Sequence, residues 1–337
     1  MPVTIRDVAK RLNLSITTVS RALDGYDDVA AETRQRVIAV AREMGYIPSH
    51  AARQMRRQRT ETLGYILPTA LPRFADPFFS EFIAGLGDEA TLHNFDLLVS
   101  TAPPGSTAEQ ALYRRWVQGR RVDGMVLSRM RLDDWRVRYL HEAGLPLVAS
   151  GRSRTPVDFP YVEVDSRSGF AALVAHLVAR GHRRIAYIGA PATLTLQADR
   201  FAGYCDGLAA AGITFDPSLV TEGNLTRMGG YQAAQRLLAL PQPPTAIVGV
   251  NDLTAIGAMR AARERGLVIG RDLAVAGFDG TEDAEHADPP LTTLNQPVYE
   301  IARRLVRMLL ALIAGEPLAE RRVVLQPELI VRASTGG

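Results

Sequence analysis

The chain has 337 residues, of which 47% are hydrophobic and 22% charged, and its formal net charge is +3. This composition excludes a largely disordered protein and is sufficient for two or three domains with buried cores. No run approaches the roughly eighteen apolar residues of a membrane span. Arg6, Asp7, Lys10 and Arg11 interrupt any apolar core that a signal peptide would need. We therefore expect a cytoplasmic protein that has no membrane partner.

The charges are unevenly distributed along the chain. Residues 1–60 contain eleven Lys and Arg against six Asp and Glu, a balance of +5, which leaves −2 for the remainder. A basic N-terminal module on a mildly acidic body is typical of nucleic-acid binding, because attraction to phosphates supplies much of the affinity. Cys205 is the only cysteine, which excludes an internal disulfide and a cysteine-built zinc site. We expect no metal and no other cofactor.

Residues 4–23, TIRDVAKRLNLSITTVSRAL, have the pattern of two short helices joined by a tight turn. The first helix has apolar residues at i, i+3, i+4 and i+7, and Thr4 can cap its first turn with Asp7 three residues later. Asn13 can adopt the left-handed turn conformation, and Ser15 can cap the second helix. The stretch therefore predicts a helix-turn-helix.

The second helix of this stretch, residues 16–23, is expected to present one face to DNA. Val19 and Leu23 point back to the core at i, i+4 spacing, which leaves the opposite face free for a major groove. An ordinary amphipathic helix pair with a solvated outer face is the alternative for this pattern by itself. The residues that we expect at the DNA are Thr4, Ser15, Ile16, Thr17, Ser20 and Arg21.

Two neighbouring segments, residues 4–23 and residues 46–68 (YIPSHAARQMRRQRTETLGYILP), resemble the lactose-repressor (LacI/GalR) family of bacterial transcription regulators. The similarity continues in the family's order through VARGHRRIAYIGAP, DRFAGYCDGL, VNDLTAIGAMRAARERGL, DLAVAGFDG and PPLTTLNQP. The resemblance implies a sequence-specific regulator, usually a repressor. Such a protein binds a palindromic operator in double-stranded DNA as a homodimer and responds to a small-molecule effector.

Residues 48–60 contain SHAARQMRRQR, which is compatible with a helix but too polar to be stable as an isolated one. The resemblance implies a hinge helix that folds on the operator and levers an apolar side chain between base pairs of the minor groove. Met55 stands where the family has a leucine, and Ser49 where it usually has an asparagine. A basic linker is the alternative. The residues expected at the DNA here are Ser49, His50, Arg53 and Met55.

From Thr62 onward, short apolar runs alternate with amphipathic helices, which is typical of a parallel α/β sheet. A second series of this kind begins at YVEVD, residues 161–165. Two such series predict two Rossmann-like lobes, and the resemblance implies a core like that of periplasmic binding proteins, with crossovers near residues 291–296 and 323–328.

The predicted fold class is thus a small all-α helix-turn-helix head plus hinge helix, joined to an α/β periplasmic-binding-protein-like core of two Rossmann-like lobes. We expect the DNA-binding domain at 1–47, the hinge helix or linker at 48–60, and the effector-binding and dimerisation core at 61–337. Lobe 1 is expected at about 61–161 and 293–323, and lobe 2 at about 162–292 and 324–337.

Polar residues at the C-ends of the expected strands should converge on a cleft between the lobes. By resemblance, Arg200, Asn251 and Asp279 hydrogen-bond the effector, while Phe78 and Phe79 pack on it. A guanidinium fork, an amide and a carboxylate suit a hydroxyl-rich ligand or a heterocycle. A structural cap for Asp279 and a salt bridge for Arg200 are the alternatives. The expected effector site comprises Asp76, Phe78, Phe79, Ser128, Arg129, Arg200, Asn251 and Asp279.

The resemblance favours a sugar or sugar derivative as the effector, with a purine or nucleoside as the second candidate. Leu225 stands where many relatives have an aromatic platform, and Leu194 and Leu196 stand near polar contacts of those relatives. This side of the pocket should therefore be more apolar. Activation instead of repression stays open, because it depends on where the operator lies relative to a promoter.

Two other classes of protein are alternatives to a regulator. A nucleotide-dependent α/β enzyme would need G-x-G-x-x-G or G-x-x-x-x-G-K-[ST], and neither motif occurs. The six histidines are scattered and form no H-E-x-x-H. A solute-binding protein of an importer would share the core fold but would need an export signal and no DNA-reading head. The sequence therefore favours a regulator and not an enzyme.

Overall fold

The computed structural model describes residues 3–46, 59–69 and 76–336. It divides into a helical unit within Met1–Thr60 and an α/β core within Glu61–Gly337. Ser49, His50, Arg53 and Met55, which the sequence analysis places at the DNA, lie outside the described residues. Each unit is considered by itself below.

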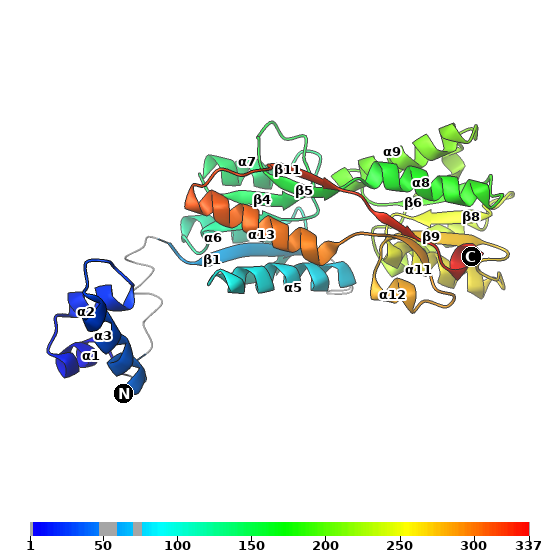
Figure 1. Cartoon of the computed structure of the whole chain (residues 1–337). Helices are drawn as coiled ribbons and strands as arrows, with labels where there is room; N and C mark the ends of the chain where they lie inside the picture. The colour runs from blue at the N-terminus through cyan, green and yellow to red at the C-terminus, as the bar shows by residue number, and fades with distance from the viewer. Residues whose placement is uncertain (1–2, 47–58, 70–75, 337) are drawn as a thin grey trace. The chain divides into compact units, whose positions relative to one another are not determined.

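The helical unit contains α1 (Ile5–Leu12), α2 (Ile16–Leu23) and α3 (Ala31–Glu43) (Figure 1). Three valines, one from each helix, form the centre of its core: Val8, Val19 and Val37 are all fully buried. Small alanines surround them, so the three helices approach closely around one apolar centre.

The ends of α1 and α2 are fixed by the side chains that the sequence analysis assigns to them. Asp7 accepts hydrogen bonds from the backbone N–H of Thr4 at 2.9 Å and from its hydroxyl at 2.7 Å. Asn13 has a φ of 52°, which is the left-handed conformation that ends α1. Ser15 Oγ accepts the N–H of Thr18 at 3.0 Å and so caps α2.

The core is built on two six-stranded sheets, each of which defines one lobe. The sheet of the first lobe has the order β11-β5-β4-β3-β1-β2, and its pairs are parallel. Helices α5 (Pro77–Leu92) and α13 (Val298–Ala314) cover one face, and α6 (Thr107–Gln118) and α7 (Trp135–Glu142) cover the other. Its strands are β1 (Thr62–Pro68), β2 (Asp96–Ala102), β3 (Gly124–Leu127), β4 (Leu147–Ser150), β5 (Tyr161–Val164) and β11 (Arg322–Leu325).

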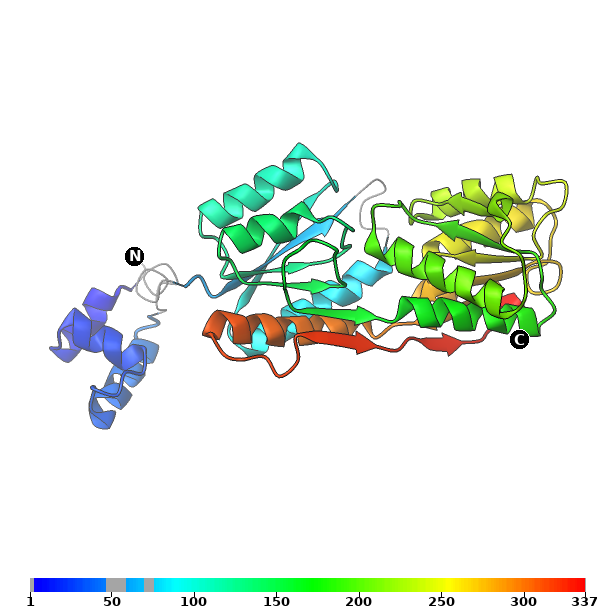
Figure 2. The same ribbon diagram turned by 90° about the horizontal axis from the view of Figure 1, so that it is seen from above.

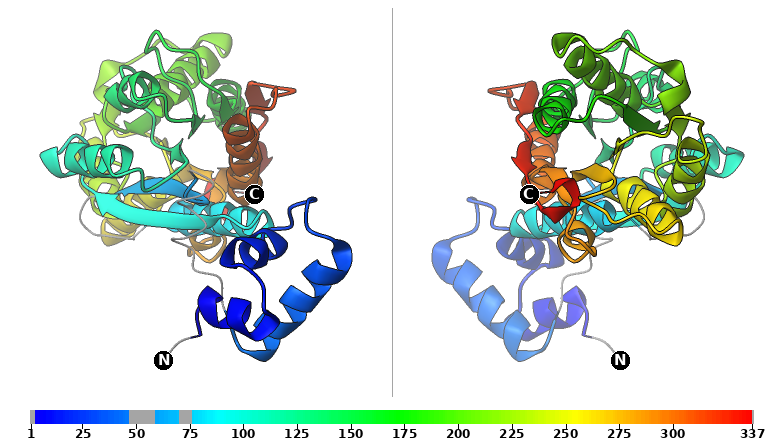
Figure 3. Two further views of the ribbon diagram at one scale, coloured as in Figure 1. Left: turned by 90° about the vertical axis from the view of Figure 1, so that its left-hand side faces the viewer. Right: turned by 90° about the vertical axis from the view of Figure 1, so that its right-hand side faces the viewer.

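The sheet of the second lobe has the order β12-β10-β9-β8-β6-β7, in which only β12 is antiparallel to its neighbour among the described strands. Helices α8 (Ser166–Ala179) and α9 (Thr195–Ala210) cover one face, and α10 (Arg227–Leu237) and α11 (Asp252–Glu264) cover the other (Figure 3). A short α12 (Glu282–Glu285) follows β9. The strands are β6 (Ile185–Gly189), β7 (Val220–Glu222), β8 (Ala246–Gly249), β9 (Ala274–Asp279), β10 (Thr292–Asn295) and β12 (Glu328–Ile330).

The chain passes between the lobes three times, between β5 and α8, between β10 and α13, and between β11 and β12. Figure 2 shows these connections in green, orange and red. The sequence analysis places YVEVD at the start of the second series, whereas β5 pairs with β4 and β11 in the first sheet. The physical reason is that β5 is hydrogen-bonded on one side to β4 and on the other to β11, which comes from a distant part of the chain. Local periodicity in the sequence does not reveal such a pairing.

The inner strands are near-continuous apolar runs because helices cover both of their faces. All four residues of β3 and of β8 are buried, as are all six of β9. The described part of the chain has no helix that is long and apolar enough to cross a lipid bilayer.

Helices α5 and α13 pack closely because Gly85 lies at their contact. A Cβ at this position would come within 2.5 Å of the backbone oxygen of Tyr299. Next to this contact, the buried Glu89 of α5 accepts hydrogen bonds from the Nε atoms of Arg303 (2.6 Å) and Arg307 (2.9 Å) of α13. Burial acts to raise the pKa of Glu89, but the bonds and charges of Arg307 and Arg303 outweigh it and lower the pKa to about 2.

Glu89→Gln should lower the free energy of unfolding of the core by about 1–3 kcal/mol at pH 7, because a buried charged acceptor of two guanidinium groups is lost. Since the folded pKa is depressed from its ordinary value of 4.5, the stabilisation is complete above that pH and fades as the pH falls towards about 2. The difference between wild type and variant in urea unfolding should therefore shrink across this window.

Glu300→Gln is the matched control, because Glu300 pairs with Arg304 and Arg307 of its own helix, α13, at the surface. An exposed pair contributes about 0–1 kcal/mol, so this variant should unfold close to wild type. Equal losses in the two variants would contradict the assignment of Glu89 as the anchor between α5 and α13.

Candidate functional site

The exposed face of α2 is the candidate DNA-reading surface. Ile16 is 45% exposed, and Thr17 and Arg21 are also exposed. Ser20 differs from the expectation: only 6% of it is exposed, and its hydroxyl donates to Asp24 at 3.3 Å. Position 20 directly follows the buried Val19 and is turned toward the core, so the exposed face is narrower than the i, i+4 pattern predicts.

Arg21 is held in place within its own unit. Its guanidinium forms an ion pair with Asp28 at 2.6 Å and lies over the ring of Tyr26, 5.1 Å from the ring centroid. Both partners come from the turn between α2 and α3. Thr4 and Ser15 are exposed at the starts of α1 and α2, but their side chains are engaged as caps.

A pocket of about 760 Å³, including its open mouth, lies between the two lobes of the core. Both lobes contribute to its wall at the C-ends of their parallel strands, which is where ligands bind in open α/β sheets. Six of the residues expected from the sequence line it: Asp76, Phe78, Arg129, Arg200, Asn251 and Asp279.

Two expected residues do not line the pocket. Phe79 is 7% exposed and packs in the core of the first lobe, with Arg129 over its ring. Ser128 is 2% exposed and hydrogen-bonds the hydroxyl of Tyr65 at 2.8 Å. Each is adjacent in sequence to a residue that does line the pocket, and neighbours in a helix or at a strand end point in different directions.

The wall also contains polar residues that the sequence analysis missed, namely Ser150, Arg152, Glu163, Ser166, Thr195, Asp199 and Gln296. Ser150 and Glu163 lie at the C-ends of β4 and β5, so the rule that located Arg129 could have found them. Thr195 and Asp199 lie on α9, and no strand-end signal marks them. Leu196 and Leu225 line the pocket and supply its expected apolar side.

Arg200 is the central cation of the pocket and is only 6% exposed. Its Nη1 donates to the backbone oxygen of Val250 at 2.5 Å, its guanidinium lies 3.8 Å from the centroid of the Phe278 ring, and Nη2 is 3.7 Å from Asp279. The Nε atom is buried and has no hydrogen-bond partner among the residues that the structure describes, and the same is true of the Thr195 hydroxyl. Unsatisfied buried donors are costly, and a ligand acceptor in the pocket would relieve them.

Asp279 faces Arg200 at the end of β9. Burial raises its pKa well above the usual range, and the charge of Arg200 acts in the opposite direction. The Nε2 amide of Gln296 donates to Asp279 at 2.6 Å. The backbone of Asp279 has a φ of 127°, which is strained for a residue with a side chain. Such strain is commonest at functional sites.

Asn251 has a structural role beside the pocket. Its Oδ1 caps α11 by accepting the N–H of Thr254 at 3.1 Å and the Thr254 hydroxyl at 2.6 Å. Its amide also donates to the backbone oxygen of Leu225 at 3.4 Å. Asn251 therefore fixes the pocket-facing start of α11 and offers little further capacity to a ligand.

Charged pairs form part of the pocket wall. Arg129 pairs with Asp76, both from the first lobe. Arg152, which follows β4, donates to Glu163 of its own lobe at 2.6 Å and to Asp199 of α9 in the second lobe at 2.7 Å. Arg152 thus joins the two lobes through an ion pair.

A second connection between the lobes is made by the backbone, and we call it the lobe clasp. The N–H of Leu132 donates to the oxygen of Thr193 at 2.8 Å, and the N–H of Thr195 donates to the oxygen of Met130 at 3.0 Å. Arg131 and Leu194 form the antiparallel bridge between these bonds. Two backbone segments far apart in sequence are therefore held together directly beside the pocket.

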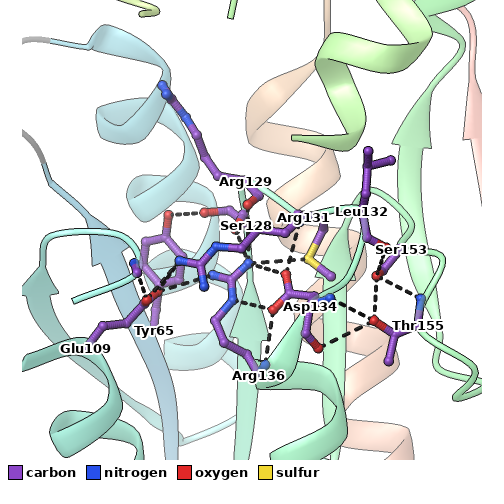
Figure 4. A network of polar contacts seen from close by, with 12 residues as sticks. Tyr65, Glu109, Ser128, Arg129, Arg131, Leu132, Asp134, Arg136, Ser153 and Thr155 are labelled. Atoms are coloured by element: carbon purple, nitrogen blue, oxygen red, sulfur yellow. Dashed lines mark hydrogen bonds and ion pairs between the residues drawn. The ribbon is translucent and has the colours of Figure 1, made fainter. Parts of the chain in front are cut away.

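A buried polar network fixes the loop that supplies one half of the clasp (Figure 4). Arg136 donates to Asp134 through Nε at 2.8 Å and Nη2 at 2.6 Å, and also to the backbone oxygens of Ser128 and Arg129. Arg131 donates to both carboxylate oxygens of the buried Glu109 at 2.8 Å.

The ion pair of Asp134 and Arg136 is almost completely shielded from water, since the two residues are 0% and 2% exposed. Burial acts to raise the pKa of Asp134, but the hydrogen bonds and charge of Arg136 lower it overall. The loop is therefore rigid where it meets the second lobe.

In the ranges that the structure describes, no group of three His, Cys, Asp or Glu residues is arranged to hold a metal ion.

Comparisons with known proteins agree with this architecture. A family described as "Bacterial regulatory proteins, lacI family" matches residues 4–49, and one described as "Periplasmic binding protein-like domain" matches residues 174–335. The HTH-type transcriptional regulator AglR of Rhizobium meliloti (strain 1021) is 37% identical over 340 residues, which cover 100% of this chain and 95% of AglR.

Two solved structures are similar over almost the whole chain. The lac repressor dimer bound to operator and the anti-inducer ONPF has a TM-score of 0.86 at 29% identity, with 99% of each chain covered. The complex of the transcriptional regulator CelR with cellobiose has a TM-score of 0.77 at 33% identity, with 98% of this chain and 99% of that chain covered. The predicted fold class, a helix-turn-helix head with a two-lobed periplasmic-binding-protein-like core, is confirmed.

The two family descriptions match in the predicted order, and AglR is related over the full length, so the prediction that this is no enzyme is also confirmed. This chain belongs to the LacI family of DNA-binding transcription regulators.

Proposed function

We propose that the protein is a repressor that binds a palindromic operator as a homodimer and is controlled by a sugar or sugar derivative in the interlobe pocket. The observation that carries the proposal is the pocket itself, in which polar groups of both lobes converge around two buried donors without hydrogen-bond partners. We further propose the division of labour expected from the sequence, with DNA reading by residues 1–47, a hinge at 48–60 and effector binding and dimerisation by 61–337.

Dimerisation is supported by the size of the DNA-reading surface. An α2 of eight residues covers few base pairs, and pairing two copies about a two-fold axis doubles the site that is read. The similar lac repressor structure is described as a dimer bound to operator. A palindromic operator follows from that symmetry.

A sugar is supported by the chemistry of the pocket wall. Among the described lining residues, Phe78 is the one aromatic ring, and carboxylates, hydroxyls, amides and guanidinium groups surround it. Such a wall matches the alternating donors and acceptors of a polyhydroxylated ligand. The similar CelR structure is described as a complex with cellobiose.

Control would follow from a change in the angle between the lobes. A ligand that contacts both sides of the pocket stabilises one relative arrangement, and that arrangement sets the spacing of the two hinge segments in the dimer. By linkage, the effector must then bind the DNA-bound and free protein with different affinities.

The direct test is operator capture from genomic fragments followed by footprinting and by fluorescence anisotropy with cellobiose, other saccharides and nucleosides as effector probes. We expect a footprint with two-fold symmetry and an operator affinity that a saccharide lowers. A stable monomer at micromolar concentration, or an asymmetric footprint, would exclude the proposed dimer. A response to nucleosides alone would replace the sugar by the second candidate.

Arg21 is proposed to read a base, because its exposed guanidinium lies on the candidate face of α2 and a guanidinium fork suits bidentate contact with guanine. Arg21→Ala should weaken operator binding by about 1–3 kcal/mol and flatten the preference at one position of each half-site. Affinity measurements on a set of single-base operator variants check this. A uniform loss on every sequence would show that Arg21 contacts phosphate only.

Asp279→Asn should leave operator affinity within about threefold of wild type and raise the effector concentration needed for a response at least tenfold, since a carboxylate acceptor of ligand hydroxyls is lost. Asparagine has nearly the same shape as aspartate, which limits the effect on packing and folding. The control is Asp283→Asn, which removes a surface carboxylate paired with Arg227 outside the pocket. If both variants retain a wild-type response, the pocket assignment fails.

The lobe clasp can be weakened by removing one backbone donor, the N–H of Thr195. Thr195 is the first residue of α9, where proline is well tolerated, and Leu194 before it has φ −86° and ψ 135°, which suit a residue that precedes proline. Thr195→Pro removes the N–H that donates to Met130, whereas the control Thr195→Ala removes the hydroxyl and the γ-methyl but keeps the N–H. We expect faster amide exchange in residues 128–134 and weaker effector binding in the proline variant than in the alanine variant. Identical behaviour of the two would show that the clasp bond does not hold the lobes.

A further inference from the structure

Four exposed arginines lie close together in sequence, at the end of α6 and in the turn that follows it, and we call them the arginine patch. Arg114 and Arg115 lie in the second half of α6, and Arg120 and Arg121 lie in the turn between α6 and β3. None of the four side chains has a hydrogen bond or an ion pair to any residue that the structure describes.

The absence of partners is unusual in this chain. The other exposed arginines of the described core are, with the exception of Arg154, bonded to a carboxylate, a hydroxyl or a backbone oxygen. Exposed arginines without an ion pair recur in the helical unit, at Arg6, Arg11, Arg36 and Arg42. The patch therefore resembles the part of the chain that binds DNA more than the rest of the core.

The patch lies where the core receives the chain from the DNA-binding unit. Strands β1 and β3 pair with Leu63 opposite Gly124, which places the turn before β3 next to the start of β1. The N–H of Asp123 donates to the oxygen of Thr62 at 2.8 Å, and the N–H of Glu61 donates to Asp123 at 2.8 Å.

The patch has a rigid base. Tyr113 and Trp116 of α6 are each 1% exposed and pack in the core of the first lobe. The N–H of Arg121 donates to the oxygen of Trp116 at 2.9 Å, and Arg120 adopts a left-handed φ of 45° that ends the helix. The nearby carboxylate of Asp123 accepts a hydrogen bond from the backbone N–H of Glu61. The other nearby carboxylate, that of Asp96, lines a shallow hollow together with Arg121.

We propose that the arginine patch is a second DNA-binding surface, which contacts the phosphate backbone of the duplex beside the operator half-site. A guanidinium fork matches the geometry of a phosphate, and arginines without carboxylate partners give up no ion pair when they bind one. The contact carries no base preference, so it adds affinity equally to operator and non-operator DNA. The proposal rests on the proposed binding of operator DNA.

The test is the salt dependence of DNA binding, since each phosphate contact contributes a slope of about −0.9 to the logarithm of affinity against the logarithm of salt concentration. The full-length dimer carrying Arg120→Gln and Arg121→Gln should show a slope smaller in magnitude by roughly 2–4, because two contacts are lost in each of two subunits. Its affinity should fall at least tenfold at low salt on operator and on scrambled duplexes of 40 base pairs alike.

Two matched variants distinguish a contact from a general effect of charge. Arg260→Gln with Arg263→Gln removes the same charge from α11 of the second lobe, where the two arginines pair with Glu264 and Asp288. This variant should retain the wild-type slope. Arg120→Lys with Arg121→Lys keeps the charge and should restore most of the slope.

Each remaining outcome has a defined meaning. A wild-type slope in the glutamine variant, or an equal loss in the α11 variant, overturns the arginine patch as a DNA contact. A loss confined to the operator, with scrambled DNA unaffected, also overturns it and points to an effect on the hinge segment. If wild-type protein binds no genomic fragment specifically, the proposed function fails instead.

Discussion

The lobe clasp is the interaction on which the arrangement of the interlobe pocket depends. Two backbone hydrogen bonds join Met130 and Leu132 to Thr193 and Thr195, and they lie beside the pocket rather than at the crossings of the chain. Because backbone groups make the contact, its strength depends on loop geometry, which the buried Arg136 and Asp134 fix from one side. The shape of the pocket therefore depends on these loops and on the relative position of the two lobes.

Much of the fold could be predicted from the sequence, because periodic patterns record local structure well. The cap at Ser15, the left-handed turn at Asn13 and the two α/β series are all local signals, and the structure contains each of them. The prediction was less exact where the outcome depends on distant partners. Strand β5 belongs to the first sheet because β11 returns to pair with it, and Ser20 is buried where a short helix turns it toward the core.

The pocket illustrates the same limit at the level of single residues. The strand-end rule located Arg129 and Asp279 correctly on the wall, but it could not separate Phe78 from Phe79 or Arg129 from Ser128, since neighbours in sequence point in different directions. Asp199 was missed because its importance comes from Arg152 across the pocket. A contact between lobes has no signature in the local pattern of either partner.

The three passages of the chain between the lobes have a consequence for the protein as a genetic unit. Strand β11 and helix α13 belong to the first lobe, although β6 to β10 of the second lobe precede them in sequence. No uninterrupted stretch of the gene therefore encodes one lobe without part of the other. A truncation between residues 190 and 321 removes strands from both sheets, whichever end of the chain is lost, and a recombination event there combines strands of two parents in each sheet. A single crossover inside the core therefore mixes both lobes, whereas a crossover near residue 60 exchanges the N-terminal unit as a whole.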